Sequence, residues 1–451
     1  MEIISKAYEP VLQILKRFQK RSPEGRMMKY CIHQQVEEGV LLFNLLTREL
    51  LLLTEDEYGN PAALEYLWER WFVVPVETNE RELVDFARLV LSAHHKKSKS
   101  ITDYIIYTTT DCNARCFYCF QHGTARIPMT QETAEKVLNY IVEHCDRERV
   151  RLQWFGGEPL LNPDVIDTIC TGLRRAGVAF DSYLVTNGYL LDDAMVRRAM
   201  ESWNLHSVQI TLDGTEKIYN RSKAYVNTQG SPYQIVLSNM ERVINAGANL
   251  YVRLNLDLYN AQDLLQLVDC LGERFGGQKG VYVYAHHLFN GVESSAQFHT
   301  QEGWEEREQA LMGVVERIDR WNMTAKHTIR KKLPINACRA DSDRGVVITP
   351  GGHIGACDHY PDSEFIGHVD RAEFDPEMVA AWREKVPAIP ECVDCVHYPD
   401  CLLLKKCPEN KCFPQLRMKF LRDKERRMRN EYEMWKNHET PMEEDGLDLD
   451  D

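Results

Sequence analysis

The feature that most constrains this chain is a run of three cysteines, Cys112, Cys116 and Cys119, in the segment DCNARCFYCFQHG. Their C-x3-C-x2-C spacing follows an apolar, strand-like segment at 104–108, so three thiolates converge on one point. Thiolates are soft ligands that suit iron–sulfur clusters, and three of them leave one iron of a 4Fe-4S cluster without a protein donor. A structural zinc site is the alternative, but such sites usually bind four ligands and pair their cysteines as C-x2-C. The triplet therefore predicts a cluster with one iron open to chemistry.

Length and composition indicate a globular protein of two or three domains. The chain has 451 residues, of which 44% are hydrophobic and 27% charged, as in ordinary soluble proteins. No apolar run reaches the length of a membrane span, and charges interrupt the apolar positions at the start, so we expect no signal peptide and a cytoplasmic location. The net charge of −14 and the lack of a basic stripe argue against nucleic acid as a partner.

From about residue 100 the sequence alternates strand and helix patterns. Six apolar strand candidates are separated by segments with helical periodicity, such as 130–145 and 233–246. The expected strands are 104–108, 150–155, 180–186, 207–212, 250–256 and 281–284. This pattern predicts an α/β fold with a partial (β/α)6 barrel, whose site lies at the carboxyl ends of the strands. The cysteine triplet follows the first strand, where this architecture expects a site loop.

The second strand candidate ends in Gly156, Gly157 and Glu158, followed by Pro159. Two glycines allow backbone to approach a ligand closely, and the acidic residue can accept from an ammonium group. On its own this pair would be a turn. One βα unit after the cysteine triplet, it indicates a binding site.

The triplet and the GGEP segment together resemble the radical S-adenosylmethionine (SAM) superfamily. The resemblance implies that SAM chelates the open iron, that GGEP binds its amino group mainly through backbone oxygen, and that Tyr118 packs near its adenine. Asn187 in TNG and Gln209 in QITLDG match further strand ends of that family. Arg253 alternates with Asn255 on one strand face, and we expect it to meet a carboxylate, such as that of SAM, or an acidic neighbour in the barrel.

Residues 1–98 form a first unit before the triplet. An amphipathic helix at 8–20 is followed by strand-like segments within 28–54 and by helices at 61–71 and 80–93. This order resembles the winged-helix-like domain that precedes many radical SAM enzymes acting on ribosomally made peptides. That domain binds a leader segment as an added strand. A small packing domain that caps the barrel is the alternative.

A second cysteine group occupies the C-terminal part of the chain. In a large chain without an export signal, the fourteen cysteines indicate metal ligation rather than disulfides. Four of them, Cys31, Cys145, Cys170 and Cys270, are scattered and are expected to be apolar thiols. The C-terminal group comprises Cys338, Cys357, Cys392, Cys395, Cys401, Cys407 and Cys412. A zinc ribbon on the C-x2-C pair is the alternative to iron–sulfur clusters.

This group resembles the SPASM extension, which holds auxiliary 4Fe-4S clusters, although its fifth and sixth cysteines are spaced more widely than usual. The resemblance implies that Cys407 joins Cys338 and Cys357 at one cluster and that the second is bound by Cys392, Cys395, Cys401 and Cys412. Seven cysteines cannot close two four-iron clusters. One iron is then open, or bound by another residue or by substrate. In similar sulfatase-maturating enzymes an aspartate after the second cysteine is a candidate base; here it is Asp358, for which a turn cap is the alternative.

The resemblance implies an enzyme with SAM, three 4Fe-4S clusters and a flavodoxin- or ferredoxin-type electron donor. We expect a recognition domain at 1–98, a radical SAM barrel at 99–330, a SPASM domain at 331–415, and a charged helix with a disordered acidic tail at 416–451. The expected reaction is thioether formation on a ribosomally made precursor peptide. Carbon–carbon cross-linking, formylglycine formation, and a metal-stabilised binding or electron-carrying protein are the alternatives.

Overall fold

The computed structural model divides the chain into two compact units. The first comprises Met1–Ser98, Lys326–Ser342 and Arg383–Glu444, and the second comprises Lys99–Ala325 and Asp343–Trp382. The structure describes residues 1–18, 22, 24–57, 60–95, 100–145, 147, 149–288, 301–335, 338–359, 364–371, 373–401, 404–407, 412 and 414–439. The predicted acidic tail at 441–451 lies outside the described residues.

Six parallel strands form the centre of the second unit and confirm the predicted βα alternation. Neighbouring strands pair in chain order, so that β12, β11, β10, β9, β8 and β7 lie side by side. Their bounds are β7 (Asp103–Thr109), β8 (Val150–Gly156), β9 (Phe180–Thr186), β10 (Leu205–Leu212), β11 (Asn249–Leu256) and β12 (Val281–His287). This is the partial (β/α)6 barrel that the sequence predicts.

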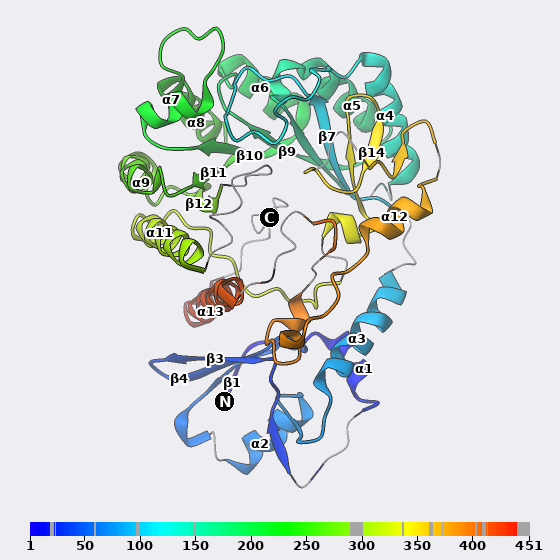
Figure 1. Ribbon diagram of the computed structural model, residues 1–451, viewed down its shortest axis with the longest axis vertical. Coiled ribbons are helices and arrows are strands. Elements are labelled where there is room, and N and C mark those ends of the chain that lie inside the picture. The colour runs from blue at the N-terminus through cyan, green and yellow to red at the C-terminus, as the bar shows by residue number, and fades with distance from the viewer. Residues whose placement is uncertain are drawn as a thin grey trace. The chain divides into compact units, whose positions relative to one another are not determined.

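Helices connect these strands and cover the outer side of the sheet (Figure 1). Several begin where the sequence supplies a cap or a proline: Thr130 and Asp192 accept hydrogen bonds from the first turns of α4 and α6, and prolines open α5 and α8. Their bounds are η2 (Pro159–Leu161), α4 (Gln131–His144), α5 (Pro163–Arg175), α6 (Asp193–Trp203), α7 (Glu216–Lys223), α8 (Pro232–Asn245), α9 (Ala261–Phe275) and α11 (Gln301–Arg320).

The barrel sheet continues into the segment around Cys357. Strand β13 (Gly345–Ile348) pairs in parallel with β7, and β14 (His353–Gly355) and β15 (Gly367–His368) follow as antiparallel neighbours. Strands β13 and β14 form a hairpin, with Gly352 at a φ of 83° in its turn. The helix α12 (Pro376–Trp382) ends this part. The middle portion of the expected SPASM segment, Asp343–Trp382, thus belongs to the same compact unit as the barrel.

The first unit contains a four-stranded antiparallel sheet in the order β1-β5-β4-β3. The predicted strands appear as β3 (Cys31–Val36), β4 (Gly39–Asn44) and β5 (Leu50–Leu53), and the helices as α1 (Glu9–Leu15), α2 (Pro61–Glu69) and α3 (Glu80–His95). Strand β1 (Glu2–Ser5) and the small pair β2 (Gly25–Met27) and β6 (Val73–Pro75) were not anticipated, and α1 is shorter than expected. A short strand of mixed polarity gives little periodic signal.

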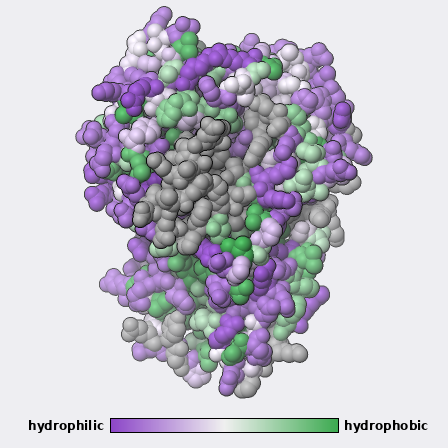
Figure 2. Space-filling model, viewed as in Figure 1, coloured by the Kyte–Doolittle hydropathy of each residue, from purple (hydrophilic) through white to green (hydrophobic). Residues whose placement is uncertain are grey.

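The C-terminal helix belongs to the first unit. Helix α13 (Pro414–Lys436) contributes Met428 and Tyr432 to the same apolar core as the leucines of β4 and β5. The short turns η1 (Glu55–Glu57), η3 (Arg339–Asp341), η4 (Pro390–Cys392) and η5 (Tyr398–Asp400) complete the unit. Hydrophilic residues predominate on the face seen in Figure 2. None of the helices among the described residues combines the length and apolar character that crossing a membrane requires.

Candidate active site

The loop after β7 carries the cysteine triplet and is fixed at its start by short-range hydrogen bonds. The Asp111 N–H donates to the Thr109 hydroxyl at 3.0 Å, and the Cys112 N–H donates to the Asp111 carboxylate at 2.8 Å. The loop then returns to the strand, because the Thr110 N–H donates to the Ile127 carbonyl at 3.0 Å. Both ends of the loop are therefore anchored at the carboxyl end of β7.

The three cysteines of the loop are half-buried and lie close enough to interact. The Cys119 N–H donates to the Cys116 carbonyl at 3.1 Å, and the Ala114 N–H donates to the Cys112 sulfur at 3.3 Å. Burial, together with the charges of Glu158 and the other two cysteines, raises the pKa of the Cys112 thiol to about 12. Such thiols ionise when a metal replaces their protons. The donor set fits an iron–sulfur cluster with three protein ligands.

The two glycines after β8 bring a second chain segment against this loop. The Gly157 and Glu158 N–H groups donate to the carbonyls of Thr109 and Asp111 at 2.9 and 2.8 Å. A Cβ on Gly156 would meet the Thr109 carbonyl oxygen at 2.1 Å, and one on Gly157 would meet that of Asp111 at 2.2 Å. Gly156 also has a φ of 129°, which favours glycine. Only glycine permits this approach.

Glu158 is fully buried and organises the end of the next strand. Its carboxylate accepts from the Thr186 hydroxyl at 2.7 Å and from the N–H groups of Asn187 and Leu160 at 2.9 and 3.1 Å. Burial raises its pKa to about 6, against these hydrogen bonds. Its carboxylate therefore positions Asn187, whose amide donates to Asn113 in the cysteine loop at 2.6 Å.

A buried hydrogen-bond network fixes the Tyr118 hydroxyl, and the sequence did not predict it. Its hydroxyl lies 2.7 and 2.8 Å from the two Asp213 carboxylate oxygens, and Lys223 donates to it at 2.8 Å. Lys223 also pairs with Asp213 at 3.2 Å, and both are almost fully buried. Burial disfavours the ammonium, but Asp213 outweighs it and keeps the pKa of Lys223 well above its usual value. Asp213 lies in the QITLDG segment, so its position beside the motif was the available signal.

Arg253 and Gln209 lie on adjacent strands and are linked through one tyrosine. Arg253 donates to the Asn255 side chain at 3.0 Å and hydrogen-bonds Tyr284, whose hydroxyl donates to Gln209 at 2.8 Å. His286 Nδ1 lies 3.5 Å from the Arg253 guanidinium. The alternation of Arg253 and Asn255 places both on one strand face, as expected. Arg253 thus contacts Asn255, and its expected contact with a carboxylate stays a prediction.

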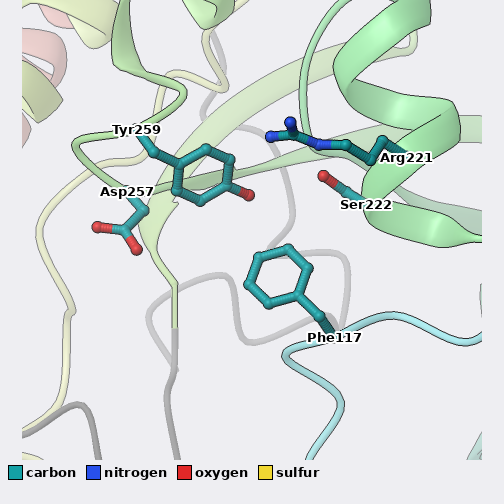
Figure 3. A pocket seen from close by; sticks show the side chains of 5 residues that line it. All are labelled: Phe117, Arg221, Ser222, Asp257 and Tyr259. Carbon is teal, nitrogen blue, oxygen red and sulfur yellow. The ribbon is translucent and has the colours of Figure 1, made fainter.

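A cleft of about 330 Å³ opens beside the cysteine loop (Figure 3). Phe117 from the loop faces Tyr259, which follows β11, with ring centroids 5.9 Å apart, and Phe117 is 62% exposed. Arg221 and Ser222 of α7 and Asp257 complete the lining. The cleft thus offers aromatic faces together with an acidic, a basic and a hydroxyl group. Sequence reasoning named none of these five residues, because they come from three separated segments.

Comparison with known families shows what this part of the chain is similar to. Residues 106–271 match the model of the radical SAM superfamily, and this range includes the cysteine loop, GGEP and Arg253. This part of the chain is therefore similar to the radical SAM superfamily. Members of this superfamily bind SAM at a 4Fe-4S cluster, which the thiol triplet fits.

Curated relatives match less than half of the chain. An AdoMet-dependent heme synthase of Methanosarcina barkeri is 24% identical over 183 residues, which is 40% of this chain and 48% of that protein. A probable GTP 3',8-cyclase of Archaeoglobus fulgidus is 27% identical over 147 residues, or 33% and 46% of the two chains. The chain thus spans about half the length of these relatives.

Solved structures show the same fold over more of the chain. Native anSMEcpe with bound AdoMet and Kp18Cys peptide has a TM-score of 0.58 at 14% identity, covering 74% of this chain and 99% of that one. Streptococcus suis SuiB bound to S-adenosylmethionine has a TM-score of 0.52 at 15% identity, covering 86% and 99%. The similarity therefore extends beyond the radical SAM domain.

The predicted ligands outside the radical SAM domain fall into both compact units. Cys357 and Asp358 belong to the unit with the radical SAM domain, where Cys357 lies 3.7 Å from His359 Nδ1 and the Asp358 carbonyl accepts from the Tyr107 hydroxyl at 2.7 Å. The other six cysteines belong to the unit with the N-terminal sheet. These are Cys338, Cys392, Cys395, Cys401, Cys407 and Cys412.

Four cysteines of the first unit lie near one another. Burial raises the pKa of the Cys395 thiol, and Cys401 and Cys412 raise it further. The Arg417 side chain hydrogen-bonds Cys412 and is also influenced by Cys392 and Cys395. The structure therefore brings together the four residues that the SPASM resemblance assigns to one cluster. Their role as ligands stays a prediction.

Residues of α3 hold the segment that carries these cysteines. The Arg88 guanidinium donates to the carbonyls of Tyr398, Pro399 and Cys401 at 2.8, 3.0 and 2.8 Å. The Tyr398 hydroxyl donates to Asp85 at 2.6 Å, and Arg81 lies over the Tyr398 ring at 4.9 Å. Helix α3 thus fixes the turn between Cys395 and Cys401.

Proposed function

We propose that this chain is a radical SAM peptide maturase that joins a cysteine sulfur to a carbon of a ribosomally made precursor peptide. SAM, when bound at the reduced cluster, supplies a 5'-deoxyadenosyl radical that abstracts hydrogen from unactivated carbon. The protein positions the reacting carbon and excludes water and oxygen. A flavodoxin- or ferredoxin-type protein supplies the electron, and the enzyme acts in the cytoplasm.

The residues of the radical SAM domain have separate roles in this proposal. Cys112, Cys116 and Cys119 bind the cluster, and the backbone at Gly156, Gly157 and Glu158 receives the SAM amino group. The fit is supported by the close approach of Gly157 to Asp111 in the cluster loop. Asn187, Gln209 and Arg253 contact the polar parts of SAM. Tyr118 and the cleft beside Phe117 hold the adenosyl group, since aromatic faces stack on a base.

The observation that carries the thioether reaction is the number of C-terminal cysteines. The radical SAM domain uses three cysteines, and the C-terminal part supplies seven for two auxiliary clusters that need eight ligands. The group that contains Cys392, Cys395, Cys401 and Cys412 has four thiols. The cluster bound through Cys357 would then keep an open iron that could bind a substrate cysteine as its thiolate, with the thiol proton passing to solvent or to Asp358.

The N-terminal sheet provides the leader-binding surface in this proposal. Among the described strands, β3 pairs with β4 alone, so it offers a free edge. The Cys31 N–H donates to the Met28 carbonyl and not to β4. Because strand geometry repeats every two residues, the N–H groups of His33 and Gln35 also point away from β4. The leader segment pairs with these groups as an added strand.

A proline at this edge tests leader binding. Gln35→Pro removes one outward N–H without removing a bond to β4, so leader affinity should fall about tenfold, the value of one lost hydrogen bond at the upper end of its range. Gln35→Thr is the matched control, because it changes the exposed side chain and keeps the N–H. Titration of a fluorescent leader peptide measures both. Equal affinity in the two variants would exclude β3 as the binding edge.

The reaction is tested with precursor peptides encoded near the gene. After anaerobic incubation with SAM and reductant, a thioether product is lighter by two hydrogen atoms and resists alkylation of its cysteine. A product of the same mass whose cysteine still alkylates indicates a carbon–carbon cross-link. Tandem mass spectrometry locates the joined residues. If 5'-deoxyadenosine forms but the peptide is unchanged, that peptide is not the substrate.

Formylglycine formation is a second candidate, because Asp358 follows Cys357 as it does in the similar sulfatase-maturating enzymes. The structural similarity to anSMEcpe with its bound Kp18Cys peptide also favours it. That reaction removes the sulfur of a substrate cysteine, whereas thioether formation retains it. Sulfur content of the product therefore separates the two. Formylglycine formation gives no role to the first hundred or so residues, whereas the precursor-peptide reaction gives them the role of binding the leader.

A further inference from the structure

The segment Cys357-Asp358-His359 gathers three potential metal donors at one point. The Cys357 sulfur lies 3.7 Å from His359 Nδ1, and that nitrogen lies 3.8 Å from an Asp358 carboxylate oxygen. One donor atom from each residue lies within 4.8 Å of the others. All three side chains are half-buried. The sequence predicts roles for Cys357 and Asp358 but none for His359.

The barrel holds this segment in place. Strand β13, which leads to it, pairs in parallel with β7, and Ile348 lies opposite Ile106. The Tyr107 hydroxyl of β7 donates to the Asp358 carbonyl at 2.7 Å, and the Tyr107 ring packs edge-on against Phe155 of β8 at 5.1 Å. Tyr107 is fully buried. The backbone between Cys357 and His359 is therefore fixed to the radical SAM domain.

His359 also contacts the loop of the SAM-binding cluster. Its ring lies 6.0 Å from that of Phe120, which directly follows Cys119. Phe120 is 37% exposed. The imidazole thus lies between the predicted auxiliary ligand Cys357 and the loop of the radical SAM cluster.

The distance between the Cys357 sulfur and His359 Nδ1 bears on whether the imidazole is a metal ligand or a hydrogen-bond donor. Donors bonded to one tetrahedral metal ion at about 2.3 Å for sulfur and about 2.0 Å for nitrogen lie roughly 3.5 Å apart. In a 4Fe-4S cluster each protein ligand takes its own iron, so a sulfur and a nitrogen this close do not both ligate one cluster. An N–H···S hydrogen bond fits the observed 3.7 Å.

We propose that His359 donates a hydrogen bond from Nδ1 to the Cys357 sulfur and thereby raises the reduction potential of the auxiliary cluster that Cys357 binds. The inference rests on the proposed function, in which Cys357 is a cluster ligand. Reduction adds negative charge to a cluster, and a donor aimed at a ligand sulfur stabilises that charge. His359 is a positioning residue, because it acts through Cys357.

Two variants test the hydrogen bond. His359→Phe keeps an aromatic ring for the contact with Phe120 and removes the donor, whereas His359→Asn keeps an N–H donor near the Nδ1 position. We expect His359→Phe to lower the equilibrium constant for reducing one auxiliary cluster about tenfold, which is ~59 mV for one electron. His359→Asn should restore most of this shift. Redox titration followed by electron paramagnetic resonance measures the potentials on the reconstituted full chain.

The outcomes separate the failure of this inference from the failure of the proposed function. Potentials of all clusters that are unchanged in His359→Phe, at full iron content, would overturn the hydrogen bond. A nitrogen hyperfine coupling that disappears in His359→Phe would also overturn it, because His359 would then be a ligand. A single zinc ion retained by Cys357 and His359 would do the same. If Cys357→Ala keeps the iron of all three clusters, the cluster assignment in the proposed function fails.

Discussion

The two cysteine regions are held in different ways. The loop with Cys112, Cys116 and Cys119 is fixed by backbone hydrogen bonds and by two glycines that admit close contact. The segment with Cys395 and Cys401 is fixed by long side chains, because Arg88 reaches three of its carbonyls from 310 or more residues away in the chain. The loop with Cys112 is thus stabilised by its own sequence motif, and the segment with Cys395 is stabilised by helix α3, which lies far away in the sequence.

This difference indicates which parts of the protein depend on one another. The radical SAM loop needs only residues of its own compact unit, so it should bind its cluster whatever happens at α3. Six of the seven C-terminal cysteines, all but Cys357, share a compact unit with the N-terminal sheet and helices. Damage to the proposed leader-binding unit should therefore reach the second auxiliary cluster. The following predictions test this contrast.

The largest effect is expected at Gly157. In Gly157→Ala the new Cβ would lie 2.2 Å from the Asp111 carbonyl oxygen, and so the cluster loop must move away from β8. A displacement of about 1 Å at a reacting centre costs on the order of a hundredfold in rate. Formation of 5'-deoxyadenosine from SAM should fall by at least about that factor. Liquid chromatography of the quenched reaction measures it.

Gly313→Ala is the control, because a Cβ at Gly313 of α11 meets nothing within 4 Å and alanine favours a helix. This variant should cleave SAM as the wild-type protein does. Equal rates in both alanine variants would mean that the contact between Gly157 and Asp111 does not position the site.

The second prediction concerns Arg88. Arg88→Gln cannot bind three carbonyls at once, so the segment with Cys395 and Cys401 should lose its geometry. The reconstituted protein should then hold about eight irons per chain in place of about twelve, taking four per cluster. SAM cleavage should continue. Iron analysis and the 5'-deoxyadenosine assay measure the two results on one sample.

The matched control is Arg149→Gln in the barrel unit, where the side chain is 64% exposed and pairs with Asp181. It should keep the full iron content. Loss of SAM cleavage together with iron in Arg88→Gln would contradict the independence of the two regions.

The smallest effect is expected at Asp400, which pairs with Arg48 at 2.6 Å and Lys424 at 2.8 Å. Burial opposes ionisation of Asp400, but the two cations outweigh it and hold its pKa well below the usual range. A depressed carboxyl pKa adds stability that is present above the unfolded-state pKa of about 3.9 and is lost as the pH falls through the folded pKa. Asp400→Asn leaves buried Arg48 without its partner, which costs about 3 kcal/mol.

Thermal melting of the metal-free chain at several pH values measures this contribution. Asp400→Asn should melt lower than the wild-type protein at pH 7, and the difference should shrink as the pH falls below about 4. Asp181→Asn, whose partner Arg149 has a 64% exposed side chain, should melt close to the wild-type temperature. A difference for Asp400→Asn that stays constant at all pH values would contradict the role of its charge.

The sequence predicted the radical SAM loop because its physics is local. Spacing of Cys112, Cys116 and Cys119 and the glycine pair both lie in short segments next to strands with clear periodicity. Lys223 and Phe117 were not found, because their roles depend on how three segments converge at the barrel rim. The pairing of β13 with β7 was also missed, since the sequence between them does not record which strand becomes a neighbour.

The contacts of the C-terminal cysteines were the least predictable. Arg88, Asp85 and Tyr398 are ordinary surface residue types on a helix and in a turn, and nothing in their spacing links them. Strand β1 carries too few apolar residues to give a periodic signal. Long-range side-chain contacts are set by the folded chain, so a single sequence does not reveal them.

The most direct test of the central claim compares the wild-type protein with a variant in which Cys112, Cys116 and Cys119 are all alanine. Both are reconstituted anaerobically, and iron and 5'-deoxyadenosine are measured after addition of SAM and a reductant. The account predicts about twelve irons and SAM cleavage in the wild-type protein, and about eight irons without cleavage in the variant. SAM cleavage that persists in the variant would contradict the assignment of this loop as the catalytic site.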